Sequence, residues 1–165
     1  MKKIIIILFA ITIIFIVNQK EEVIIPKESI RFRIIANSNN LDDQLLKTKI
    51  TKDIEDNFLP NIQTTNYQIT KEEITNNLPK LNQLISKYNI KYDINFGNNY
   101  FPQKEYKGIT YPEGNYESLV ITLGQGIGNN FWCVLYPPLC LIEPTNDLSN
   151  IEYKSLVLET LKKLN

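Results

Sequence analysis

The segment Gly124–Cys140 constrains the fold of this chain more than any other. It holds three of the six glycines, two of the eight prolines, both cysteines and the single tryptophan. The apolar, β-branched run Ser118–Leu123 leads into the glycines, which predicts a strand followed by a sharp chain reversal. The aromatic run Phe131–Tyr136 predicts a second strand. Pro137 and Pro138 must end it, because proline cannot donate to a strand ladder.

We interpret the glycine-rich segment as a tight hairpin turn, because glycine adopts backbone angles that other residues avoid. Glycines after a strand also occur in phosphate-binding loops. Here the spacing departs from G-x-G-x-x-G and the segment leads into a strand-like run instead of a helix, so we expect no nucleotide site. The predicted turn residues are Gly124, Gly126, Gly128 and Asn130.

The two cysteines predict a disulfide bond. Cys133 and Cys140 lie symmetrically about the Tyr136–Pro137 bond, so a chain folded back there places them opposite each other. A tight turn with proline second would need a cis bond at this position, whereas a wider loop would not. The bridge would close a loop of about eight residues and contribute roughly 2.5 kcal/mol in the chain-entropy model. The alternative is a pair of buried free thiols, and the compartment decides between the two.

The N-terminus predicts export. Met1–Lys3 is basic, and Ile4–Val17 is a run of fourteen residues that is apolar except for Thr12. As a helix this run spans about 21 Å, short of the roughly 30 Å hydrocarbon core, which is typical of a signal peptide. A retained membrane anchor is the alternative, because no small-x-small cleavage site is evident. We expect residues 1–22 to form this leader and residues 23–165 an exported domain, where a disulfide can persist.

Charge and composition exclude several classes of function. Basic and acidic residues number 18 each, so the net charge of zero gives no electrostatic case for nucleic acid. The chain has no histidine, which removes Ser-His and Cys-His nucleophile pairs and histidine metal sites. We therefore expect no catalytic residue, metal or cofactor. An enzyme with a pair of carboxylates, acting on cell-wall sugar, is the alternative, since it needs only two acids at a defined separation.

Apolar periodicity predicts three helices. The apolar residues Leu46, Ile50, Ile54 and Phe58 recur at every fourth position. Helix-start signals recur as well, each a polar cap with an acid three residues later. In chain order the predicted helices are Leu41–Leu59 with Asn40 and Asp43, Lys71–Tyr88 with Thr70 and Glu73, and a last helix with Ser149 and Glu152, whose apolar stripe is Val157, Leu158, Leu161 and Leu164. Pro79 should kink the second helix or divide it.

Alternating apolar residues predict the strands. Ser29–Ala36 is the first, with Phe32 and Ile34 on one face. Ile90–Phe96 is the second, followed by a turn at Gly97–Asn99 and a hairpin partner in Tyr100–Tyr111. With the two strands that flank the glycines, the order is strand, helix, helix, four strands, helix. This order predicts a single compact α+β domain whose mostly antiparallel sheet carries helices on one face.

Bulky side chains near the prolines form the first candidate partner-binding surface. They are Phe131, Trp132, Tyr136, Pro137, Pro138 and Leu139. Tryptophan and tyrosine are common interface anchors, although a large aromatic residue in a strand often fills the core instead. By alternation, Phe131, Cys133 and Leu135 share one face of the strand and Trp132, Val134 and Tyr136 the other. We expect one face to be core and the other to be free for a partner.

Five motifs in this chain are those of a known family. They are Arg31-x-Arg33-Ile34-Ile35-Ala36-Asn37-Ser38, Asp42-Asp43-Gln44-x-Leu46-Lys47, Phe101-Pro102-x-Lys104-x-Tyr106, Pro112-x-Gly114-x-Tyr116-Glu117-x-Leu119 and Gly124-x-Gly126-x-Gly128-x-Asn130-x-Trp132-Cys133-Val134-Leu135-x-Pro137-Pro138-Leu139-Cys140. Over about residues 30–142 the chain resembles the stage II sporulation protein R family. It departs from the family at Phe131, Gln125 and Asn39, where a second tryptophan, an acid and an aspartate are usual.

The resemblance implies a signalling protein of sporulation, not an enzyme. Family members are secreted from the forespore into the intermembrane space between forespore and mother cell. There they activate a membrane-embedded aspartic protease that processes pro-sigma-E, and the catalytic aspartates belong to that partner. The resemblance implies membrane contact only through the leader, no nucleic acid and no small-molecule substrate. Asn37, Ser38 and Asp43 form a second candidate binding patch. The alternative function is an exported cell-wall-binding or wall-hydrolysing domain.

Overall fold

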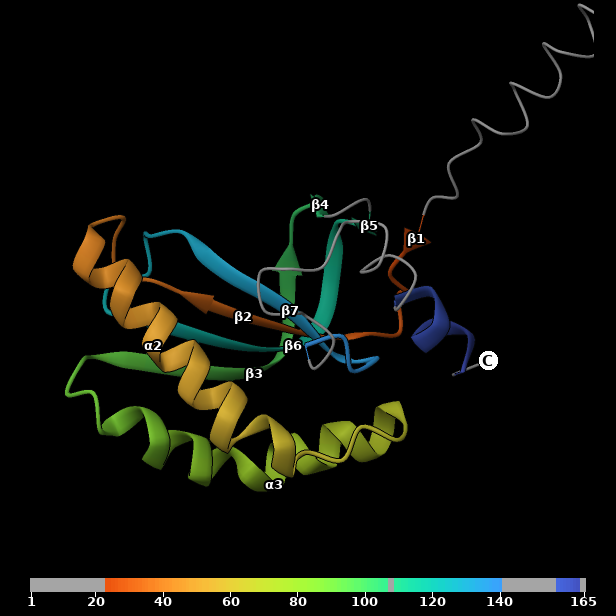
Figure 1. Cartoon of the computed structure of the whole chain (residues 1–165), viewed down its shortest axis with the longest axis horizontal. Coiled ribbons are helices and arrows are strands. Elements are labelled where there is room, and N and C mark those ends of the chain that lie inside the picture. Colours follow the sequence, from red (N-terminus) through yellow and green to blue (C-terminus); the bar gives the residue numbers. More distant parts are fainter. Residues whose placement is uncertain (1–22, 107–108, 141–156, 164–165) are drawn as a thin grey trace, which may run out of the picture.

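Strand β2 (Ile30–Ile35) lies at the centre of the fold, between β6 (Gly114–Leu123) and β7 (Asn130–Tyr136) (Figure 1). With β3 (Tyr92–Phe101) at one edge, these strands form a four-stranded sheet in the order β3-β6-β2-β7. β2 pairs parallel with β6, and the other two pairings are antiparallel. The computed structural model describes residues 23–106, 109–140 and 157–163. The predicted α+β domain with a mostly antiparallel sheet is confirmed.

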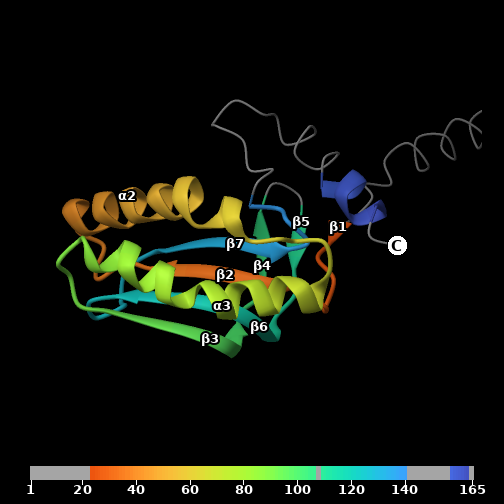
Figure 2. The same ribbon diagram turned by 90° about the horizontal axis from the view of Figure 1, so that it is seen from below.

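Two helices cover one face of the sheet, α2 (Leu41–Asn57) and α3 (Tyr67–Ser86) (Figure 2). A short 3-10 helix, η1 (Leu59–Asn61), follows α2. The apolar stripe predicted for the first helix faces the sheet, with Ile50, Ile54 and Phe58 fully buried and Leu46 partly buried. The fully buried members of this main core include Phe32, Ile34, Ile50, Ile54, Phe58, Ile74, Leu81, Ile85, Leu119 and Ile121. Burial of an aliphatic or aromatic side chain contributes about 1.5–3 kcal/mol, so this layer carries most of the hydrophobic stabilisation.

The predicted helix starts are partly wrong. α3 begins at Tyr67, four residues before the predicted start, because the side chain of Asn66 accepts a hydrogen bond from the backbone N–H of Ile69 at 2.8 Å. Thr70 lies inside the helix instead of capping it. Asn40 does occupy the cap position of α2, but its side chain makes no capping hydrogen bond. α3 continues through Pro79 as one helix, so the predicted division there is wrong.

The turn predicted at Gly97–Asn99 is also wrong, because these residues lie inside β3 and pair with Ser118, Glu117 and Tyr116 of β6. The side chain of Asn99 donates a hydrogen bond to Ser118 Oγ at 3.0 Å. The cross-strand ladder thus overrides the local turn preference of glycine and asparagine. The hairpin partner of β3 is β6, not Tyr100–Tyr111.

A second, three-stranded sheet lies at the end of the domain where β2 begins. Its order is β1-β5-β4, formed by β1 (Val23–Ile24), β5 (Ile109–Tyr111) and β4 (Lys104–Tyr106). A second apolar cluster forms here, which includes Val157 from the helical residues 157–162 (Figure 1). Its buried members are Ile25, Ile109, Tyr111, Val134, Leu139 and Val157. This cluster confirms the predicted apolar character of Val157, Leu158 and Leu161, the last two of which pack against it.

Some predictions fall outside the described residues. These are the leader at residues 1–22, the helix start at Ser149 and Glu152, and Leu164. Among the residues that the structure does describe, no helix combines the length and the hydropathy needed to cross a membrane.

Candidate partner-binding surfaces

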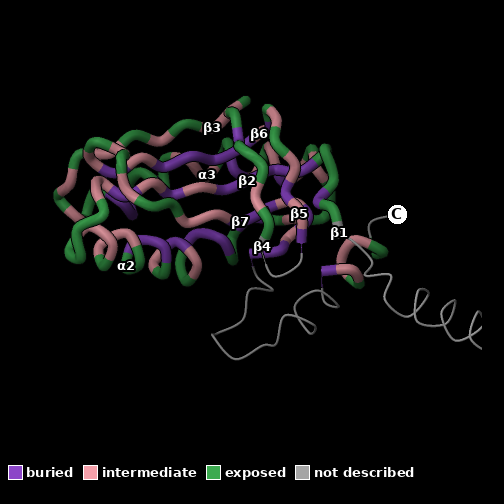
Figure 3. Tube along the Cα trace, turned by 90° about the horizontal axis from the view of Figure 1, so that it is seen from above, coloured by how far each residue is buried: buried purple, intermediate pink, exposed green. Residues whose placement is uncertain are grey.

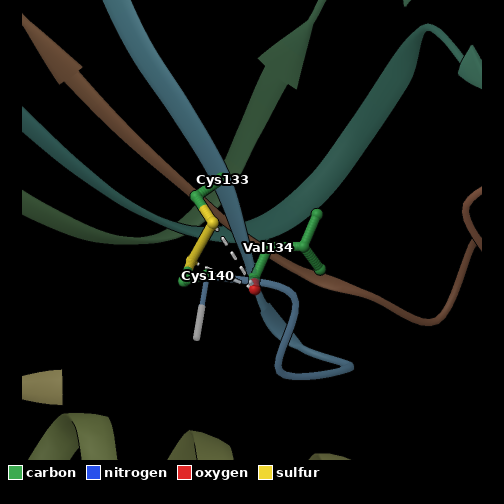
Figure 4. Close-up of a disulfide and its surroundings, with 3 residues drawn as sticks. All are labelled: Cys133, Val134 and Cys140. Atoms are coloured by element: carbon green, nitrogen blue, oxygen red, sulfur yellow. Dashed lines mark hydrogen bonds between the residues drawn. A yellow bond between two sulfur atoms is a disulfide. The ribbon is translucent and has the colours of Figure 1, made fainter. Parts of the chain in front are cut away.

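The predicted disulfide between Cys133 and Cys140 is present, with the two Cα atoms 5.5 Å apart (Figure 4). Both residues are buried beside the main core. The backbone N–H groups of Leu139 and Cys140 donate to the carbonyl of Val134 at 3.1 and 3.2 Å, and the Tyr136–Pro137 bond is cis. The bridge and these hydrogen bonds hold the two prolines in a compact turn against β7.

The first candidate surface, the six bulky residues near the prolines, lies closer to the core than a projecting tip would. Pro137 and Leu139 are buried, and the other four are half-buried. Phe131 packs edge-on against Phe32 on the helix side, with ring centroids 6.0 Å apart. Trp132 points to the opposite face of the sheet, where its ring meets Phe101 at 5.2 Å. Of the six residues, Trp132 is the one that the structure places on the face away from the helices.

The predicted alternation along β7 holds up to Val134 and fails at Tyr136. Phe131, Cys133 and Leu135 share the helix side, where Cys133 and Leu135 belong to the main core and Phe131 packs against it. A register shift between β2 and β7 then brings Tyr136 opposite Ile30, and its ring meets Tyr67 of α3 at 6.1 Å. An irregularity of this kind turns a strand so that later side chains change face. Tyr136 is therefore on the helix side, and Trp132 does not share its surface.

The second candidate patch is a hydrogen-bonded network around Asp43. The Asp43 carboxylate accepts hydrogen bonds from the hydroxyl of Ser38 and from the side-chain amide of Asn37, the latter at 2.8 Å. These two hydrogen bonds lower the pKa of the Asp43 carboxyl below its ordinary value of 3.8. The other end of the Asn37 amide accepts from the backbone N–H of Gln125 at 2.9 Å. Asp43 thus ties the start of α2 to the end of β2 and to the glycine-rich segment.

The glycines connect β6 to β7 across the end of β2, so the predicted hairpin between these strands is wrong. Gly124 and Gly126 have positive φ angles of 59° and 67°, a backbone conformation that favours glycine. A side chain on Gly128 would overlap the backbone carbonyl of Ser38, and one on Gly124 would overlap the Asn37 amide. These two glycines are therefore required by the close approach of the connection to the end of β2. Asn130 begins β7 and is exposed.

Exposed aliphatic side chains accompany the second patch. Leu41 and Leu45 in the first turns of α2 are 73% and 58% exposed, and Ile127 in the glycine-rich connection is 69% exposed. The N–H of Ile127 donates to the carbonyl of Asn37 at 3.3 Å, so the connection that carries it is fixed against the start of the helix. Large aliphatic residues exposed together at one end of a domain are typical of contact surfaces.

Two basic residues on the sheet face away from the helices are absent from the predicted site residues. Arg31 and Arg33 of β2 point there, together with the rings of Phe101, Tyr116 and Trp132. Arg31 is 1% exposed, and its guanidinium carbon lies 3.4 Å from the centre of the Tyr116 ring. Arg33 is half-buried, with its guanidinium carbon 4.9 Å from the Phe101 ring. The sequence does contain a pattern that indicates them, because two arginines alternate with the core residues of a buried strand.

Both arginines contact aromatic rings, and several of their N–H groups have no hydrogen-bond acceptor. Arg31 donates one hydrogen bond to the carbonyl of Pro112 at 3.0 Å, while its Nε and Nη1 have no partner. Arg33 Nε is likewise buried without a partner. Burial lowers the pKa of both guanidinium groups from the ordinary value of 12.5, and both stay charged at any physiological pH. Rings attract a cation through their faces, but they accept no strong hydrogen bond.

The structure gives the alternative enzyme no pair of acids in a described hollow. One hollow lies between the end of α2 and α3, with a volume of about 560 Å³. Its lining residues are Asp56, Asn57, Pro60, Asn61, Lys80, Gln83, Leu84 and Lys87. A glycosidase needs two carboxyl groups facing each other, and this lining contains one. No cluster of three metal-ligating side chains occurs within the described ranges.

Comparison with known proteins identifies the family. The family model for stage II sporulation protein R matches residues 26–146. The stage II sporulation protein R of Bacillus subtilis (strain 168) is 34% identical over 136 residues, which cover 78% of this chain and 61% of the relative. The chain therefore spans less than two thirds of the length of that relative. No solved structure matches the chain. This chain belongs to the stage II sporulation protein R family.

Proposed function

We propose that this chain is an exported messenger of sporulation that activates a membrane-embedded aspartic protease, which then processes pro-sigma-E in the mother cell. The observation that carries the proposal is family membership across residues 26–146, which include the whole four-stranded sheet and both covering helices. The leader predicted at residues 1–22 would direct the domain to the space between forespore and mother cell. The buried disulfide is consistent with that oxidising location.

Activation needs a difference in binding. A messenger shifts a protease toward its active arrangement only if it binds that arrangement more tightly than the inactive one. The messenger needs no reaction of its own, because the catalytic aspartates are supplied by the partner. Two surfaces are available for this contact, the sheet face around Trp132 and the end of the domain that carries Asp43 and Ile127.

The two surfaces differ in kind. The Asp43 end presents aliphatic side chains on a rigid support, since Asn37 and Ser38 are engaged inside the domain by their hydrogen bonds. In our proposal these residues act by holding Ile127 and the first turn of α2 in place. The Trp132 face presents a ring beside a cation, and aromatic residues and arginine recur among interface anchors.

The test is co-expression of the full chain with the partner protease and pro-sigma-E, read out as cleavage of the pro-sequence. We expect cleavage only when the leader is intact, and none when export is blocked although the chain accumulates. Trp132→Ala should reduce cleavage while the exported protein stays folded. Cleavage by a chain confined to the compartment that made it would contradict the proposed route.

A further inference from the structure

The face of the sheet away from the helices carries two arginines that are absent from the ion pairs of the described residues. We name it the arginine face, and it consists of Arg31, Arg33, Phe101, Tyr116 and Trp132. On this face Arg31 Nε and Nη1 and Arg33 Nε are buried donors with no acceptor. A buried donor without an acceptor is unfavourable, and more so when it belongs to a charged group. These buried atoms are closed to an acceptor from outside, so a partner could reach only the half-buried guanidinium of Arg33.

The ion pairs among the described residues include neither arginine. These pairs are Lys52–Asp56, Lys71–Glu117 and Lys163–Glu159. Glu117 alternates with Tyr116 and Ser118 and reaches Lys71 of α3, so it belongs to the helix side. Asp93 is exposed on β3, two strands away from β2, which is about 10 Å at ordinary strand spacing. Neither arginine therefore has an acidic partner in the ion pairs of the described residues.

Two aromatic rings lie next to Arg33. Trp132 is its neighbour across the β2–β7 pairing, and the Phe101 ring lies 4.9 Å from the guanidinium carbon. Phe101 pairs with Gly114 at the far end of the β3–β6 ribbon, beyond the strand pairs that β6 makes with β2. Its ring can meet Arg33 and Trp132 because the ribbon bends back over the sheet, as Figure 3 shows from above. Arg33 thus lies beside two rings that contact each other, not on a flat surface.

We propose that the arginine face binds a carboxylate-bearing segment of a protein partner, an acidic peptide whose side chain meets the half-buried guanidinium of Arg33 beside Phe101 and Trp132. A planar guanidinium matches a carboxylate with two parallel hydrogen bonds, and flanking rings exclude water from that pair. A flat lipid surface fits poorly, because Arg33 is half-buried beside rings. The inference deepens the proposed function by naming the chemistry of the partner, and it rests on that function only for the identity of the partner.

The single tryptophan of the chain is a built-in reporter for this test, because it lies beside Arg33. Purified full-length protein in detergent would be titrated with a synthetic peptide of alternating glutamate and glycine, with the fluorescence of Trp132 recorded. We expect a saturable change that weakens as salt rises, since salt screens exposed charge over about 8–10 Å. A matched lysine peptide should cause no change.

Two variants separate the arginine face from net charge. Arg33→Gln removes one positive charge at the site, and we expect affinity for the glutamate peptide to fall about tenfold or more. Lys52→Gln removes the same charge from the exposed side of α2, where Lys52 pairs with Asp56, and should leave affinity unchanged. Anionic lipid vesicles should compete only weakly with the peptide.

Three results would overturn the proposal: no fluorescence response to the glutamate peptide, equal losses in the two variants, or tighter binding to vesicles than to peptide. Failure of the proposed function is a separate result. It would appear as absent pro-sigma-E cleavage by a protein that still binds the glutamate peptide through Arg33.

Discussion

The two faces of strand β2 bury different kinds of side chain. Phe32 and Ile34 point toward the helices and are fully buried among apolar side chains. Arg31 and Arg33 point the other way, into rings, with donors that no described residue satisfies. The two faces share one backbone and differ only in the side chains that alternate along it. The helix side can be explained by packing alone, whereas the arginine side keeps polar groups that packing does not need.

This contrast indicates where stability and recognition lie. A buried cation on rings is less favourable for folding than an apolar residue of similar volume, because desolvation offsets its attraction. A strand selected only for stability would carry apolar residues on both faces. We interpret Arg33, which is half-buried, as the arginine that contacts a partner, since Arg31 is fully buried. Single substitutions can test the contrast, and their expected effects on stability range from large to small.

Phe32→Ala should cause the largest loss of stability, because it empties a fully buried site between sheet and helices. Phenylalanine-to-alanine changes in cores cost about 3–5 kcal/mol. The free energy of unfolding, measured by chemical denaturation of the full chain, checks this value. A loss below about 1 kcal/mol would show that the helix side is not the main core.

Cys133→Ser should cause the second-largest loss of stability. It removes the disulfide that closes the proline turn, and the expected loss is about 2–4 kcal/mol. Denaturation with and without a reductant checks it, since reduction should lower the stability of the wild type and leave the variant unchanged. Equal sensitivity of the two proteins to the reductant would contradict the assignment.

Gly128→Ala should have an intermediate effect. The added methyl group would overlap the carbonyl of Ser38, and because that is backbone, relief requires the connection to move. Overpacking of this kind costs about 1–3 kcal/mol. Gly97→Ala is the matched control, because the nearest atom to its added methyl group is 4.0 Å away. Equal melting temperatures for the two variants would show that the connection is not fixed against β2.

Asp43→Asn should change how stability depends on pH. The folded-state pKa of Asp43 lies below its ordinary value of 3.8, so the folded state favours the ionised form. Its contribution is present above about pH 4 and is lost as pH falls through the folded-state value. We expect the variant to be less stable than the wild type at neutral pH, with a difference that shrinks in acid. A constant difference across pH would contradict the role of the Asp43 carboxylate.

Local patterns predicted the helix side well. The spacing of Ile50, Ile54 and Phe58 and the alternation around Phe32 each record which face of one element is buried, and these assignments are confirmed. The cysteine spacing predicted the bridge for the same reason, because both partners lie within one turn. Periodicity succeeds where a single element and one apolar surface decide the outcome.

Local patterns cannot predict which strands pair when they lie far apart in the sequence. Nothing near Gly124 indicates that β2, some ninety residues earlier, lies between the two strands that the glycines connect. Gly97 reads as a turn until β6 pairs with it. Arg31 and Arg33 read as the solvated side of a strand, and their contact with Phe101 exists only because the β3–β6 ribbon bends over them. The candidate surfaces depend on these long-range contacts more than the core does.

The most direct test of the account is Arg33→Gln in the full chain, with pro-sigma-E cleavage measured beside the free energy of unfolding. Arg33 is half-buried and makes no ion pair with a described residue, so we predict a change in unfolding free energy within about 1 kcal/mol. Cleavage should fall about tenfold or more, because the contact with the partner loses its charged group. Full cleavage by a stably folded Arg33→Gln protein would contradict the account.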